Sequence, residues 1–433
     1  VITPVFDRAG REILFYVGSR GHHADIGGIT PGSMPPFSRT LDEEGVLFTN
    51  FQLVQGQGAD RPARLREAEC LALLQSRPHP ARNPAQNLAD LKAQIAANEK
   101  GREELLRMVD QFGLEVVQAY MRHVQDNAEE SVRRVITRLK DGAYDLELDN
   151  GAHIRVKITV DHAARGATID FTGTSAQLPN NFNAPSAICV AAVLYVFRTL
   201  VDDEIPLNAG CLKPLKIVIP EGSMLNPTPP SAVVAGNVET SSCITNALYG
   251  ALGVLAAGQG TMNNFTFGNA RHQYYETISG GSGAGAADVA AGGAMRDGGW
   301  ADADGFDGTD VVQTHMTNSR LTDPEVLEFR YPVRLDSYAI RAGSGGRGRW
   351  HGGDGGTRRI RFLEPMTASI LANSRRIAPF GLAGGDSGQP GRNWVERTDG
   401  TRVDLPHIGS VDMQPGDVFV IETPGGGGFG PPR

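Results

Sequence analysis

The sequence predicts an α+β protein in which mostly antiparallel β-sheets are combined with an inserted helical region and glycine-rich loops. Two observations support this class. Stretches with alternating apolar and polar residues lie on both sides of residues 61–140, where apolar residues instead recur at helical spacing. Glycine contributes 54 of the 433 residues, nearly twice its usual share, which indicates many tight turns and close backbone contacts.

The change of pattern along the chain divides it into four subregions. Residues 1–60 predict a β-hairpin followed by a loop, and residues 61–140 predict helices. Residues 141–310 predict mixed α and β structure with a mobile glycine-rich loop, and residues 311–433 predict a β-rich C-terminal part. A chain of this length can bury a large core.

The first subregion opens with the predicted hairpin. Apolar segments at residues 1–7 and 13–18 flank a turn at residues 8–11, and residues 46–54 predict a third strand. Because the chain starts without methionine in the middle of a strand, we expect it to be part of a longer polypeptide.

The helical subregion carries an unusual polar face. Asp90, Gln94 and Asn98 recur every four residues, which places them on one side of a helix that Gly113 is expected to end. A row of amides next to a carboxylate is unusual on a face that meets only solvent. This face predicts either a polar contact between two helices or a structural role beside the loop at residues 19–38.

The third subregion begins with a predicted antiparallel meander over residues 144–175. Asn150 and Gly151 form the strongest short hairpin signal in the chain. A helix at residues 186–201, rich in alanine and valine, is expected to be buried. Residues 286–307, in which glycine, alanine and aspartate dominate, predict a mobile surface loop.

A further helix is predicted to open after Gly236. Thr240 or Ser241 can cap its first turn with a hydroxyl group.

The main candidate for a functional site is the loop at residues 19–38. It places His22, His23 and Asp25 directly after a predicted buried strand, and six glycines and prolines then restrict its backbone. Imidazole and carboxylate groups are ligands for zinc or manganese, and they also form general-base pairs. Alternatively, one histidine is an ordinary core residue and Asp25 only closes a turn.

Five further residues are candidates for substrate binding. Asn181 and Asn183 lie in a polar, turn-rich crossing where their amides can line a pocket, although asparagine is common in turns. Asn237, Glu239 and Thr240 lie at a predicted helix start, whose free N–H groups suit a carboxylate or phosphate. Helix capping explains these three almost as well.

The composition argues against several classes of function. The net charge of −8 comes without a basic stripe, so nucleic acid is not an expected partner. No apolar run is long enough to cross a membrane, and the four scattered cysteines predict reduced thiols in the cytoplasm. The chain has no G-x-x-x-x-G-K-[ST] loop for ATP and no G-x-S-x-G nucleophile motif.

Several long stretches resemble the hydantoinase B/oxoprolinase family, and more narrowly the C-terminal half of ATP-dependent 5-oxoprolinases. The resemblance covers essentially the whole chain. The stretches that carry it are SRGHHADIGGITPGSMPPFS at residues 19–38, NPAQNLADLKAQIAANEKG at residues 83–101, GNVETSSCITNAL at residues 236–248, HMTNSRLTDPEVLEFRYP at residues 315–332, and the pair GSGGRGRWHGGDG and TPGGGGFG at residues 343–355 and 423–430.

The resemblance implies an enzyme that opens the lactam of 5-oxo-L-proline to L-glutamate, coupled to ATP hydrolysis. A hydantoinase A-like partner would use the ATP to phosphorylate the amide oxygen, and this chain would perform the hydrolytic step with a divalent metal, manganese, zinc or magnesium. The implied metal ligands are His22 and Asp25, and the implied catalytic pair is His23 and Asp25. A homo-oligomer is also expected.

One departure from the family and two alternatives stay open. Family members carry a His-Leu-Pro-Asp segment shortly before the first strand, which resembles a source of metal ligands. This chain begins after that point, so its site is expected to be incomplete. The first alternative is an N-methylhydantoinase B or acetone carboxylase-like subunit. The second is a non-catalytic scaffold for the ATP-using subunit.

Overall fold

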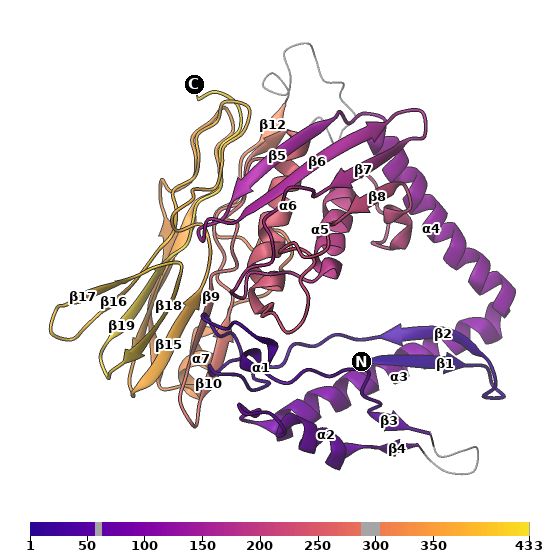
Figure 1. The fold of residues 1–433 in the computed structure, drawn as a ribbon, viewed down its shortest axis with the longest axis horizontal. Coiled ribbons are helices and arrows are strands. Elements are labelled where there is room, and N and C mark those ends of the chain that lie inside the picture. The colour runs from indigo at the N-terminus through magenta and orange to yellow at the C-terminus, as the bar shows by residue number, and fades with distance from the viewer. Residues whose placement is uncertain (57–62, 287–303, 433) are drawn as a thin grey trace.

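The computed structural model describes residues 1–56, 63–286 and 304–432 (Figure 1). Its N-terminal part combines a hairpin, β1 (Ile2–Phe6) and β2 (Ile13–Gly18), with a short pair, β3 (Val54–Gln55) and β4 (Arg64–Leu65). The helices of this part are α1 (Leu41–Glu44), α2 (Glu67–Leu74), α3 (Pro84–Phe112) and α4 (Leu114–Ile136). The predicted hairpin and the predicted helices are confirmed.

The predicted third strand is wrong except at its last residue. Residues 46–53 form no strand, and Phe48, Phe51 and Leu53 instead pack on the apolar cluster between α2 and α3. The apolar run that predicted a strand therefore covers helices, because its side chains find their apolar partners there.

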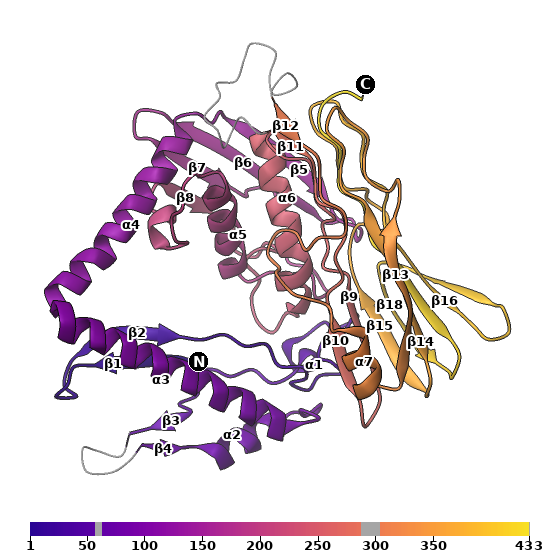
Figure 2. The same ribbon diagram turned by 180° about the vertical axis from the view of Figure 1, so that it is seen from behind.

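α3 begins and ends where its sequence dictates. The Asn83 side chain caps the first turn by accepting a hydrogen bond from Gln86 N at 3.2 Å, and Pro84 occupies the first helical position. Gly113, with φ of +85°, ends the helix as predicted, and α4 begins at the next residue. α4 then runs from the N-terminal part to the central sheet (Figures 1 and 2), where Ala128, Val132 and Ile136 enter the main core.

The central part is a four-stranded sheet packed against two helices. β5 (Gly142–Glu147), β6 (His153–Asp161) and β7 (Gly166–Asp170) form the predicted antiparallel meander, and β8 (Leu215–Val218) joins β7 in parallel. The packed helices are α5 (Ser186–Thr199), which buries one face in the main core and so confirms the predicted burial in part, and α6 (Ser241–Leu252). A 3-10 turn, η1 (Ala209–Leu212), precedes β8.

α6 does not start with the predicted side-chain cap. A single π-helical segment, η2 (Gly236–Thr240), leads directly into it. The Thr240 hydroxyl instead donates to Phe182 O at 2.6 Å, and the Ser241 hydroxyl donates to Asn237 O at 2.7 Å. Because η2 precedes α6 without a break, the N–H groups of the first turn of α6 are not the free groups of an isolated helix start.

The C-terminal part consists of two antiparallel sheets that share one apolar core (Figure 2). One sheet has the order β10 (Gln273–Glu276), β9 (Asn264–Gly268), β15 (Met366–Leu371), β18 (Ile408–Met413). The other has the order β13 (Val333–Arg341), β14 (Gly355–Phe362), β19 (Val418–Glu422), β16 (Arg392–Glu396), β17 (Arg402–Leu405). α7 (Pro324–Arg330) packs on β13, and β11 (Gly285–Ala286) pairs with β12 (Gly305–Phe306). The predicted α+β class with mostly antiparallel sheets is confirmed.

The C-terminal glycine runs hold backbones in direct contact. A Cβ atom on Gly281 would lie 1.9 Å from Gly353 O, and one on Gly426 would lie 1.9 Å from Ser282 O. Hydrogen bonds from Gly353 N to Ser282 O and from Gly426 N to Gly353 O join the same segments. Only glycine allows this approach. Most of the loop predicted at residues 286–307 lies outside the described residues.

The buried ion pair of Arg358 and Glu276 provides a test of the packing in the C-terminal part. Arg358, 1% exposed, donates from Nε and Nη2 to the two carboxylate oxygens of Glu276 at 2.8 and 2.9 Å. We expect Glu276→Gln to lower the free energy of unfolding by about 3 kcal/mol or more, because it leaves a buried guanidinium without its counter-charge. Denaturant unfolding measures this. Glu364→Gln, which removes an exposed pair with Arg271, should change it by less than about 1 kcal/mol, and equal effects would contradict the expectation.

Candidate active site

The loop after the first hairpin is organised around the carboxylate of Asp25, which is 4% exposed. One of its oxygens accepts from Gly27 N and Arg82 N, both at 3.0 Å. The other accepts from Gly32 N at 3.2 Å and from Arg82 Nη1 at 2.9 Å. Four donors thus bind one buried charge, which ties both arms of the loop to the segment that precedes α3.

Two neighbouring features fix the loop further. Gly27 has φ of +93°, and a Cβ atom there would lie 2.3 Å from His79 O, so only glycine fits. The buried amide of Asn87 on α3 donates to Asp25 O at 2.8 Å. The glycines of the loop therefore serve close packing against the residues before and within α3.

His23 forms a hydrogen-bonded pair with a carboxylate other than that of Asp25. Its Nδ1 lies 2.9 Å from an oxygen of Asp90 on α3, and Gln86 Nε2 donates to the other oxygen of Asp90 at 2.7 Å. With an ionised Asp90, this distance assigns the Nδ1 proton to the hydrogen bond. Within the described part of the chain, the Nε2 atom of His23 has no hydrogen-bond partner, which leaves it available to a ligand.

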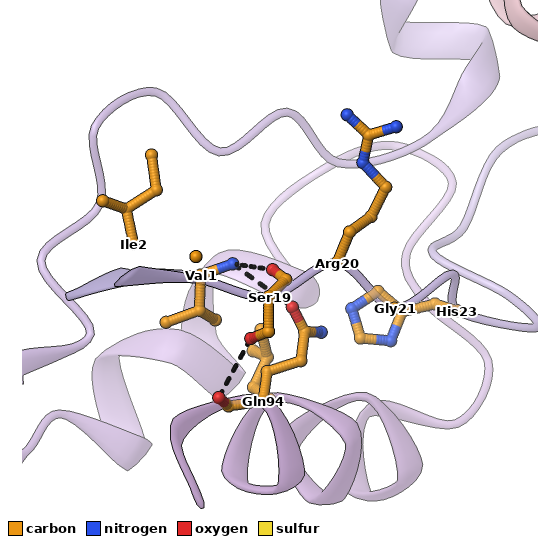
Figure 3. A pocket seen from close by; sticks show the side chains of 9 residues that line it. Val1, Ile2, Ser19, Arg20, Gly21, His23 and Gln94 are labelled. Atoms are coloured by element: carbon orange, nitrogen blue, oxygen red, sulfur yellow. Dashed lines mark hydrogen bonds between the residues drawn. The ribbon is translucent and has the colours of Figure 1, made fainter. Parts of the chain in front are cut away.

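His23 lies on a pocket of about 510 Å³ (Figure 3). Polar groups of the backbone and of side chains line this pocket. Val1 N donates to Gln94 Oε1 at 3.2 Å, and the Ser19 hydroxyl donates to Gln94 O at 3.0 Å. Arg20 also lines the pocket. The pocket has the size of a small-molecule site and carries a histidine–carboxylate pair at its edge.

The polar face of α3 meets the hairpin and the loop. Asp90 binds His23, Gln94 contacts Val1 and Ser19, and the Asn98 amide donates to Val1 O at 3.1 Å. The structural role beside the loop is thus the correct alternative, and the contact between two helices is wrong. The spacing of four residues predicted that these side chains share one face of the helix. Amide groups on such a face can both donate to and accept from an irregular backbone, as they do here.

His22 and Asp25 differ sharply in their surroundings. His22 is exposed and makes no hydrogen bond to any residue that the structure describes. Asp25 is already bound by four donors, one of them a guanidinium. Among residues 1–56, 63–286 and 304–432, no three His, Cys, Asp or Glu side chains form a group able to hold a metal ion. These residues do not fit a metal on their own, and the divalent metal stays a prediction.

The two asparagines of the crossing are fully buried. Asn181 Nδ2 donates to Pro35 O at 2.7 Å and to Ser38 Oγ at 3.1 Å, so it holds the far end of the loop. Asn183 Nδ2 donates to Ala232 O at 3.1 Å and to two carbonyls of its own turn. Asn181 therefore supports the loop, whereas Asn183 holds its own turn against Ala232, and a direct role of either residue in substrate binding stays a prediction.

The three candidates before α6 point in different directions. Asn237 is exposed, whereas Thr240 is buried against Phe182. Glu239 is also fully buried, and its Oε1 accepts from Met262 N at 2.9 Å and from Asn264 Nδ2 at 2.6 Å. The structure therefore does not bring these three side chains together, and their predicted role in substrate binding stays a prediction.

The sequence analysis did not predict the partners of Asp25 and His23. Arg82 is 57 residues away from Asp25, and Asp90 is 67 residues away from His23. No sequence motif indicates that Arg82 pairs with Asp25. The face that contains Asp90 was visible, but its partner depends on how α3 packs against the loop.

Comparison with known proteins gives the family. The Hydantoinase B/oxoprolinase family model matches residues 1–432. The chain belongs to this family. It is 42% identical to a 5-oxoprolinase of Dictyostelium discoideum and to 5-oxoprolinase 1 of Arabidopsis thaliana, with 99% of the chain covered in both. The chain spans only 32% and 34% of the length of these relatives.

Solved structures share the fold across 99% of the chain. The ATP-dependent caprolactamase from Pseudomonas jessenii gives a TM-score of 0.79 at 23% identity, over 74% of that chain. A nucleotide-free acetone carboxylase gives a TM-score of 0.82 at 18% identity, over 62% of that chain. None of the helices in the described residues has the length and apolar character to cross a membrane.

The Asp25–Arg82 pair yields a stability prediction. We expect Asp25→Asn and Arg82→Gln each to lower the free energy of unfolding by about 3 kcal/mol. The first change removes the charge that four donors bind, and the second leaves the buried Asp25 carboxylate without its counter-charge. Asp42→Asn is the control, because its ion pair with Arg77 is exposed and should contribute less than about 1 kcal/mol. Full stability in Asp25→Asn combined with loss of bound metal would instead make Asp25 a ligand.

Glu239 yields a pH prediction. Burial raises its pKa to about 8, despite its hydrogen bonds from Met262 N and Asn264. Because the folded pKa lies above the ordinary value, Glu239 favours folding at low pH, and this contribution is lost as pH rises from about 4.5 to about 8.

The matched variant for this effect is Glu239→Gln, which stays neutral. Relative to the variant, the wild-type protein should lose unfolding free energy between about pH 4.5 and about pH 8 in denaturant titrations. A difference that is constant with pH, or that changes in the opposite direction, would contradict the assignment.

Proposed function

We propose that this chain performs the hydrolytic step in the ATP-dependent opening of 5-oxo-L-proline to L-glutamate. The curated relatives at 42% identity are named 5-oxoprolinases, and the chain spans about a third of their length. That share is consistent with a second, hydantoinase A-like part that uses ATP. The observation that carries the hydrolytic role is the pair of His23 and Asp90 at the edge of a small-molecule pocket.

The need for two parts follows from the chemistry of the substrate. The five-membered lactam is a poor electrophile, and phosphorylation of its amide oxygen by the ATP-using part produces an intermediate that water can attack. Hydrolysis then requires a base that removes a proton from the attacking water. A neutral imidazole is suited to this at physiological pH.

The arrangement around His23 assigns each residue a step. Asp90 accepts a hydrogen bond from the Nδ1–H group at 2.9 Å, which fixes the tautomer with Nε2 as the base and stabilises the imidazolium that forms. Gln86 orients the Asp90 carboxylate through its bond of 2.7 Å. The Nε2 atom takes the proton of water as the oxygen bonds to the activated carbon, and it returns a proton to the ring nitrogen as the C–N bond breaks. The ring-opened acyl phosphate then reacts with a second water, which releases inorganic phosphate and leaves the carboxylate of L-glutamate.

The decisive variants are His23→Gln and Asp90→Asn, assayed in the complete enzyme with its ATP-using part. We expect His23→Gln to lower kcat for glutamate release by at least about 100-fold, with a smaller loss for Asp90→Asn, which disturbs only the tautomer and orientation. Formation of ADP should continue in both, because phosphorylation takes place on the other part.

The control is His162→Gln, which changes an exposed histidine in the turn between β6 and β7. It should leave glutamate release unchanged. Normal turnover in His23→Gln would refute the assignment of the base, and turnover of a hydantoin without turnover of 5-oxoproline would assign the chain to a sister activity.

A further inference from the structure

A second pocket, with a volume of about 360 Å³, lies between the turn that follows β5 and the β16–β17 hairpin. Four arginines and a histidine line it, together with only two aspartates. This excess of cationic groups in a concave site contrasts with the net charge of −8 for the whole chain. Such a pocket attracts anions if its cations are not already neutralised.

The two aspartates are occupied by other partners. The Asp149 carboxylate accepts from the backbone nitrogens of Arg375, Arg376 and Ile377 at 2.6, 3.0 and 2.8 Å. Asp404 forms an ion pair with Arg402 at 2.6 Å. The Arg376 side chain likewise pairs with Glu147 at 2.6 Å. Arg375 and Arg392 remain as charges without an ion-pair partner in the described ranges. Burial lowers the pKa of His407, so this residue contributes a neutral hydrogen-bonding ring at pH 7.

Arg375 holds a charge that only neutral oxygens contact. Its guanidinium donates to Asn263 Oδ1 at 2.8 Å, to Asn373 O at 2.9 Å and to Asn393 Oδ1 at 3.0 Å. It forms no ion pair with any carboxylate in the described ranges. Burial lowers its pKa to about 10, so it stays charged at neutral pH. The nearby carboxyl of Glu239, with a pKa of about 8, is mostly protonated there.

The two other groups are also available. The Arg392 side chain is exposed and makes neither a hydrogen bond nor an ion pair with any residue that the structure describes. His407 packs edge-on against Phe182, and its Nε2 atom is buried without a hydrogen-bond partner among those residues. A buried polar atom of this kind is normally satisfied, so His407, which lines the pocket, has a hydrogen-bonding atom that a turn of the ring would offer to a ligand.

We propose that this pocket binds a small oxyanion, a phosphate or a carboxylate group, between Arg392, His407 and Arg375. A planar guanidinium matches both groups, and the pocket is large enough to admit a small molecule that carries one of them. Anion binding here does not depend on the hydrolytic role of His23, because it requires no chemical step. Inorganic phosphate and an amino-acid carboxylate are the two sources that fit.

The test is isothermal titration calorimetry of the intact protein at low ionic strength, with inorganic phosphate and, separately, with L-glutamate. We expect saturable binding of at least one of them at one site per chain. Binding of phosphate alone identifies a phosphate site, and binding of glutamate alone identifies a carboxylate site. Arg392→Gln and His407→Gln should each weaken binding by at least about tenfold.

These two variants avoid Arg375, whose replacement could unfold the buried network around it. The matched control is Arg330→Gln, an exposed arginine at the end of α7, which packs on β13 at the opposite edge of the sheet from β17. It should bind as the wild type does. No saturable binding of either anion, or binding in both pocket variants that is as tight as in the wild type, would overturn the proposal.

Discussion

The buried carboxylate of Asp25 is the constraint on which the candidate active site depends. It collects two N–H groups from its own loop and two donors from Arg82, so the loop and the segment leading into α3 form one unit. α3 in turn presents Asp90 to His23. A change in the position of Asp25 is therefore transmitted through the backbone to the pair of His23 and Asp90, although Asp25 itself forms no hydrogen bond with His23.

Asp25 and Asp90 have different surroundings, which suit them to different roles. Asp25 is bound by four donors and orders the loop, while Asp90 is partly exposed and is bound by His23 and Gln86. The first environment suits a structural charge, and the second suits a group that adjusts to proton transfer at its partner. Asn181 completes the support by holding Pro35 and Ser38 at the far end of the loop.

Local sequence patterns predicted much of the fold, because the residues that form a turn, a helix end or a helix face lie close together in the sequence. The β1–β2 hairpin, the turn at Gly151, the end of α3 at Gly113 and the polar face of α3 all follow from spacing and turn chemistry. Contacts between distant segments could not be predicted. The strand expected at residues 46–54 was diverted to the helices, and the partner of Asp25 lies 57 residues along the chain.

The glycine runs show the same limit. Their number indicated close backbone approach, but which backbones meet depends on the arrangement of the sheets. Residues near Gly281, Gly353 and Gly426, separated widely in sequence, lie in mutual contact. Candidate sites built from such distant segments, including the arginine-lined pocket, carry no sequence motif and become visible only in the fold.

The central claim is that this chain supplies the hydrolytic half of an ATP-coupled lactam-opening reaction. The most direct measurement is glutamate release from 5-oxo-L-proline and ATP by the hydantoinase A-like part, with and without this chain. The account predicts that glutamate forms only when both are present, while the ATP-using part alone at most consumes ATP. Equal glutamate release without this chain would contradict the claim and would favour a supporting role.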